Sequence, residues 1–109
     1  MTRIHQLIDE LRTRAEMDVV DEEQSWLIQI AKGRDLICEV IVPHDVLEWF
    51  ASVKHKQKKK ELWSDWMDYS GYDNRPRVEL EAEMAHHILA FLDRVSTKEP
   101  LLPLKIYED

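Results

Sequence analysis

The sequence has one cysteine, two glycines and no long apolar run. The lone thiol, Cys38, cannot form an internal disulfide, and its apolar neighbours are typical of a small core residue. A cysteine nucleophile needs exposure and a nearby base, so we do not expect Cys38 to be catalytic. The chain also lacks GxSxG, GxGxxG and P-loop patterns. Glycine-rich loops that cradle phosphates with backbone N–H groups are therefore effectively excluded.

The sequence predicts neither a membrane-spanning nor a secretory segment. No stretch approaches the ~20 apolar residues that cross a bilayer. The first residues, MTRIHQLIDELRTR, lack the apolar centre of a signal peptide. At 109 residues, with 44% hydrophobic and 34% charged side chains, the chain predicts one soluble domain, 1–109. We expect a cytoplasmic protein without membrane contact.

Metal-ligand spacing is absent as well. His86 and His87 are adjacent, and neighbouring side chains on a helix point about 100° apart, so the pair cannot chelate one ion. One of the two is expected at the core edge and the other in solvent. The remaining histidines are scattered and the only cysteine is Cys38. No metal and no cofactor is predicted.

The charge is strongly acidic but uneven. A net charge of -7 disfavours nucleic-acid binding and would attract a basic partner. Residues 54–60 nevertheless carry five lysines, whereas residues 61–74 carry four acids and no base. The lysine run is interpreted as a solvated turn. Phosphate contact remains a minor alternative, because no nucleic-acid-binding motif accompanies the run.

The first half of the chain predicts a helix followed by a hairpin. Apolar residues at helical spacing indicate a helix over residues 2–16, with Thr2 as its N-cap. Residues 18–25 are predicted to form a loop. Two β-branched runs then flank residues 32–35, Lys-Gly-Arg-Asp, which favours a hairpin that ends at Pro43. Both faces of this hairpin are apolar, so we expect it to be central and covered.

Residues 45–69 fit two structures. As a helix, Asp45 and Glu48 have capping-box spacing. As strands, the segment alternates and is rich in aromatic and β-branched residues. A single hairpin is only marginally stable and needs further strands. We therefore predict a second hairpin, over 46–54 and 60–69, with the lysines at its tip.

The C-terminal part predicts a long helix and a docked tail. Pro76 suits the first turn of a helix. One apolar face follows, formed by Leu80, Met84, Ile88, Phe91, Leu92 and Val95. After Pro100 the tail is apolar enough to dock in an extended form. The predicted fold is α+β: an N-terminal helix, an antiparallel β-meander of about four strands, and a long C-terminal helix packed on the sheet.

Aromatic and acidic side chains around the second hairpin are the candidate binding residues. On a strand over 60–69, Trp63, Met67 and Tyr69 share one face, whereas Leu62 and Trp66 share the other. Asp65 and Asp68 would then face opposite sides, so paired-carboxylate catalysis is unsupported and no enzyme is predicted. An exposed tryptophan would anchor a partner. The predicted partner-binding residues are Trp49, Trp63, Asp65, Trp66, Asp68, Tyr69, Tyr72 and Asp73.

Three segments carry a resemblance. VIVPHDVLEWF, then LWSDWMDYSGY after the lysines, then the helix LEAEMAHHILAFL together resemble small immunity proteins of bacterial polymorphic-toxin systems of the contact-dependent or Rhs type. The resemblance covers about residues 36–95. It implies a protein partner, a cognate toxin domain, with no enzymatic activity and no cofactor. The alternative is a small structural or assembly module that homodimerises through its aromatic strands.

Overall fold

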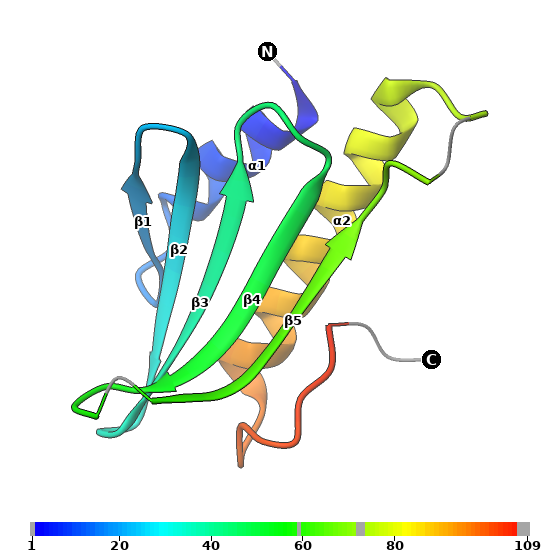
Figure 1. Ribbon diagram of the computed structural model, residues 1–109. Coiled ribbons are helices and arrows are strands. Elements are labelled where there is room, and N and C mark those ends of the chain that lie inside the picture. The colour runs from blue at the N-terminus through cyan, green and yellow to red at the C-terminus, as the bar shows by residue number, and fades with distance from the viewer. Residues whose placement is uncertain (1, 59, 72–73, 107–109) are drawn as a thin grey trace.

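The fold consists of one antiparallel sheet and two helices. The computed structural model describes residues 2–58, 60–71 and 74–106. Both helices lie behind the sheet in the view of Figure 1. The elements in chain order are α1 (Arg3–Leu11), β1 (Asp18–Asp21), β2 (Ser25–Lys32), β3 (Leu36–Pro43), β4 (Glu48–His55), β5 (Glu61–Asp68) and α2 (Arg77–Thr97). The α+β prediction is confirmed.

The sheet is a meander in which sequential strands are neighbours, in the order β1-β2-β3-β4-β5. Both predicted hairpins are present, and the helical alternative for residues 45–69 is wrong. The prediction of a loop over 18–25 is also wrong in part, because Asp18–Asp21 pairs with β2 as a fifth strand. This strand has four residues and only two apolar side chains, so its local pattern is too short to indicate pairing.

Helix α1 is shorter than its predicted range. The Thr2 hydroxyl accepts the backbone N–H of His5, at 3.2 Å, which confirms Thr2 as the N-cap. The helix ends at Leu11, and the Thr13 hydroxyl donates to the carbonyl of Glu10, at 2.7 Å, a local bond that competes with helix continuation. Every buried residue of α1 belongs to one apolar face, namely Ile4, Leu7, Ile8 and Leu11.

Helix α2 buries the predicted face. Pro76 is the N-cap rather than the first helical residue, and Lys98 is extended, which ends the helix before Pro100. All six predicted face residues are buried, together with Ala85. The tail docks as predicted: Leu101, Leu104 and Ile106 are buried in the same core.

The core lies between the helices and one face of the sheet. Alternate residues of β2, β3 and β4 enter it, among them Ile28, Val40 and Trp49. The Trp49 ring lies 5.4 Å from the Phe91 ring of α2, centroid to centroid. Neither helix of the described chain is long and apolar enough to span a membrane.

Candidate protein-interaction face

One face of the sheet is covered by helices and the other is open. In the described chain both helices pack on the same side, so the residues of opposite alternation point away from the core (Figure 1). The sequence predicted that the β2–β3 hairpin is covered. That prediction is wrong for the second face, because no described helix lies there. We call this second face the open face.

An apolar row crosses the open face from edge to edge. Val20 pairs with Leu27, Leu27 with Ile41, Ile41 with Phe50, and Phe50 with Trp66. Each strand thus contributes one residue, in direct register. Strands lie about 4.8 Å apart, so the row is about 19 Å long. We call these five residues the apolar row.

Four of the five residues of the apolar row are exposed, and Leu27 is half-buried. Trp66 is 55% exposed, and Val20, Ile41 and Phe50 are each near 40%. Leu62, on the same face of β5, is 42% exposed. Leu62 and the four exposed residues of the row are the majority of the large hydrophobic residues exposed in the described chain. The others are Val46 and Val78. Contiguous exposed apolar patches are typical of interaction sites, whereas singly exposed apolar residues are common on any surface.

The rows on either side of it are polar. On one side, Glu48 pairs with Asp68. On the other, Glu39 stands at the centre of β3 and accepts bonds from Gln29 Nε2 and Lys54 Nζ, both at 2.9 Å. Burial acts to raise the pKa of Glu39, but the bonds from Lys54 and Gln29 outweigh it and hold the pKa below its ordinary value. Glu39 is therefore ionised at neutral pH, and acids lie on both sides of the apolar row.

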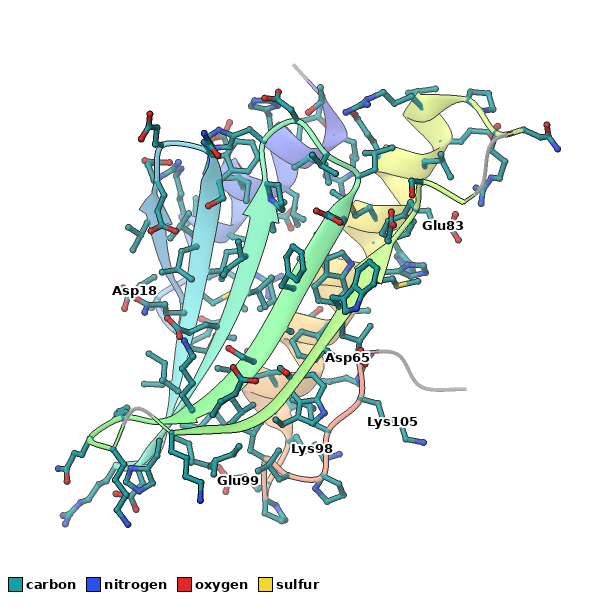
Figure 2. All side chains as sticks on the ribbon, in the orientation of Figure 1. Asp18, Asp65, Glu83, Lys98, Glu99 and Lys105 are labelled. Carbon is teal, nitrogen blue, oxygen red and sulfur yellow. The ribbon has the colours of Figure 1, made fainter. Side chains whose placement is uncertain are left out.

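A hollow lies at the β4–β5 end of the face. Its volume is about 370 Å³, and its apolar wall is formed by Ile41, Phe50 and Trp66. The Phe50 and Trp66 rings are stacked, with centroids 6.2 Å apart and planes 23° apart. Figure 2 shows the side chains of this face toward the viewer. The hollow could accept one apolar side chain of a partner beside the indole.

Two of the predicted acids lie on β5. Asp68 belongs to the open face and accepts the backbone N–H of Ser70, at 2.8 Å, and its hydroxyl, at 2.9 Å; both bonds lower the Asp68 pKa. Asp65, labelled in Figure 2, pairs with Ala51 and so follows the alternation of the helix side, although its side chain is exposed. Its carboxylate accepts the N–H of Trp66, at 2.8 Å.

The structure removes two predicted residues from any binding surface. Trp49 and Tyr69 are fully buried, because their alternation turns them toward α2. Trp63 is half-buried and stacks on Phe91, with centroids 6.0 Å apart. Among the predicted aromatics that the structure describes, only Trp66 is open to a partner. Tyr72 and Asp73 lie outside the described residues.

Trp49 and Tyr69 instead form a polar link inside the core. The indole Nε1–H of Trp49 donates to the Tyr69 hydroxyl, at 3.1 Å, and that oxygen lies 2.8 Å from Nδ1 of His87. Burial lowers the pKa of His87, against the opposing effect of Glu83. The ring is therefore neutral at pH 7, and the tyrosine O–H has two acceptors within reach, Nδ1 of His87 and Sδ of Met67, the latter at 3.3 Å. The hydroxyl is enclosed, so this link joins Tyr69 to β4 and α2 inside the core.

The described part of the chain shows neither a cluster of metal ligands nor an exposed thiol. Across residues 2–58, 60–71 and 74–106, no three His, Cys, Asp or Glu side chains converge as a metal site would require. Cys38 is 1% exposed, and burial raises the pKa of its thiol to about 12, as expected for an inert core residue.

Sequence reasoning missed most of the open face. Val20, Leu27, Ile41 and Phe50 were not predicted as binding residues, although the apolar character of both faces of β2 and β3 was visible in the sequence. The sequence alone does not give the register of the five strands, and this register is what aligns the five residues in one row. Comparison with protein families, with curated proteins and with solved structures finds no match for this chain.

Proposed function

We propose that this protein is an immunity-type inhibitor that neutralises a cognate bacterial toxin by binding it stoichiometrically through the open face. The observation that carries the proposal is the apolar row, in which Trp66 is 55% exposed beside Phe50. Buried tryptophans at the centre of an interface are frequent hot spots. The resemblance of residues 36–95 to immunity proteins supports the same function, with the bacterial cytoplasm as its location.

The charge around the row favours a basic partner. Glu48 and Asp68 flank the apolar residues on one side, whereas Glu39 on the other side is paired with Lys54, and the whole chain carries a net charge of -7. A basic toxin domain would be attracted at long range, which raises the association rate. Such a partner would place apolar side chains on the row and basic side chains beside Glu48 and Asp68.

Self-association is the second candidate function. The same face could pack on its copy as a two-sheet sandwich, and this would also cover the row. The charge favours a different partner, because a dimer of this chain would bring two acidic surfaces together. Light scattering over a range of concentrations separates the two: the inhibitor is monomeric until its partner is added, whereas the assembly module has a mass that rises with concentration.

The direct test is rescue from a toxin. The gene immediately upstream should encode a toxin domain, and co-expression of this protein should restore growth. Replacing Trp66 with Ala should abolish rescue, and reversing the charge of Asp68 should weaken it. Val78, which is 71% exposed on α2, provides the matched control, because Val78→Ala also removes an exposed apolar side chain. The proposal fails if no neighbouring gene encodes a toxin or if Trp66→Ala rescues fully.

A further inference from the structure

A second surface, distinct from the open face, is formed by two turns at one end of the sheet. Residues 32–35 connect β2 and β3, and residues 54–61, of which the structure describes all but Lys59, connect β4 to β5 and include the flanking strand ends. In a meander these turns lie at the same end, and they meet in Figure 1. The backbone N–H of Lys56 donates to the carbonyl of Asp35, at 2.7 Å, and Lys56 Nζ donates to the carbonyl of Gly33, at 3.2 Å. We call these two segments the basic tip.

The basic tip concentrates the positive charge of the chain. Its segments hold seven of the fifteen Lys and Arg residues and two of the twenty-two Asp and Glu residues. The tip therefore has a net charge of +5, and the rest of the chain -12. The sequence showed the lysine run, and the structure adds Lys32 and Arg34 to it.

Most of this charge is available. Among the described residues, no salt bridge involves Arg34, Lys56, Lys58 or Lys60, whereas Lys54 pairs with Glu39 and Lys32 lies 3.9 Å from Glu99. All four unbridged residues are exposed. They can therefore contact an external anion without first breaking an internal ion pair.

The acidic remainder does not cancel the tip at physiological salt. The molecule is 42 Å long, whereas charges are screened over about 8 Å in 0.15 M salt. The β1–β2 and β3–β4 connections, with their acids, lie at the opposite end of the sheet. A polyanion that approaches the tip thus experiences mainly the local positive charge.

We propose that the basic tip binds the phosphate backbone of a nucleic acid without reading its bases. Neither segment of the tip contains an apolar side chain, since they read KGRD and KHKQKKKE. A protein interface needs an apolar core, and membrane binding benefits from inserted apolar side chains. Phosphate binding needs neither, because counterion release supplies its free energy. Lysine provides point charges without bidentate geometry, which suits contact that is independent of sequence.

The experiment measures binding of a labelled single strand and a duplex of about 20 units each by fluorescence anisotropy, at salt concentrations from roughly 50 to 200 mM. The full-length protein is compared with the triple variant Lys56→Glu, Lys58→Glu, Lys60→Glu. We expect the variant to lose more than about tenfold in affinity at low salt, and the salt slope on the duplex to fall by about 3.

The matched control reverses three arginines away from the tip, Arg3→Glu, Arg75→Glu and Arg77→Glu, for the same change in net charge. This control should retain nearly wild-type binding, and circular dichroism should verify that both variants are folded. Arg34→Glu alone should also weaken binding, since it lies on the other turn. Equal losses in the two triple variants would overturn the proposal, as would an absence of binding at low salt. So would equally tight binding of polyglutamate or anionic vesicles.

Discussion

The indole of Trp66 stacks on the ring of Phe50, 6.2 Å between centroids, on the face of the sheet that no described helix covers. Three residues earlier in β5, Trp63 stacks on Phe91 in the core. One strand therefore supplies one aromatic to the fold and one to the surface. The open face acquires a rigid anchor because the cross-strand partner holds the indole in place.

The link between Trp49 and Tyr69 should contribute measurably to stability. Replacing Tyr69 with Phe removes the hydroxyl and leaves the indole N–H of Trp49 and Nδ1 of His87 without this buried partner. We expect the free energy of unfolding to fall by about 1–3 kcal/mol. Urea denaturation measures it. Ser64→Ala removes an exposed hydroxyl as control and should change stability by less than about 0.5 kcal/mol. Equal stability of Tyr69→Phe and wild type would show that the link is not stabilising.

His87 should make stability depend on pH. Its pKa in the folded protein lies below the ordinary value of 6.5, chiefly because burial disfavours the charged ring. As the pH falls through 6.5, the unfolded chain takes up a proton that the folded protein does not, so the free energy of unfolding decreases. The decrease is complete once the pH is below the folded pKa.

The measurement is urea denaturation between about pH 8 and pH 5. Most carboxylates stay ionised in this range, so they contribute little to the change in stability with pH. His87→Gln should lose stability less steeply than wild type as the pH falls. His86→Gln removes the smaller lowering effect of His86 on the His87 pKa, so it should reduce the slope less than His87→Gln does. The interpretation is refuted if His87→Gln retains the full slope.

Asp65 should protect the free edge of β5. Its carboxylate accepts a hydrogen bond from the backbone N–H of Trp66. In the antiparallel pattern this N–H points away from β4, toward the free edge of the sheet. Charged side chains on edge strands prevent pairing between molecules. Asp65→Thr frees this N–H and should promote association as the concentration rises, measured by light scattering.

Glu61→Thr is the control for the edge, because it removes the same charge from the start of the same strand. It should behave like wild type. If Asp65→Thr associates no more than Glu61→Thr, the carboxylate does not protect the edge.

The sequence predicted most of the fold because its elements have clear local patterns. The face of α2 from Leu80 to Val95 repeats at helical spacing, and the alternation of Trp63 and Trp66 correctly assigned them to opposite faces of β5. Strand β1 was not predicted, since Val19 and Val20 are too few to specify a period without their partners in β2.

The binding face was harder to predict for a different reason. Alternation separates the two faces of a strand, but both faces of β3 are apolar, and only tertiary packing decides which one receives the helices. Trp49 and Trp66 were therefore equal candidates from the sequence. The structure buries Trp49 and exposes Trp66.

The central claim is that the apolar row binds a toxin, and calorimetric titration tests it most directly. The toxin domain encoded upstream is titrated into wild type, Trp66→Ala and Val78→Ala. We predict a 1:1 complex with wild type and with Val78→Ala, and a loss of about 30-fold or more in affinity for Trp66→Ala, equivalent to the roughly 2 kcal/mol of a hot spot. Equal affinity of Trp66→Ala and Val78→Ala for the toxin domain would contradict the account.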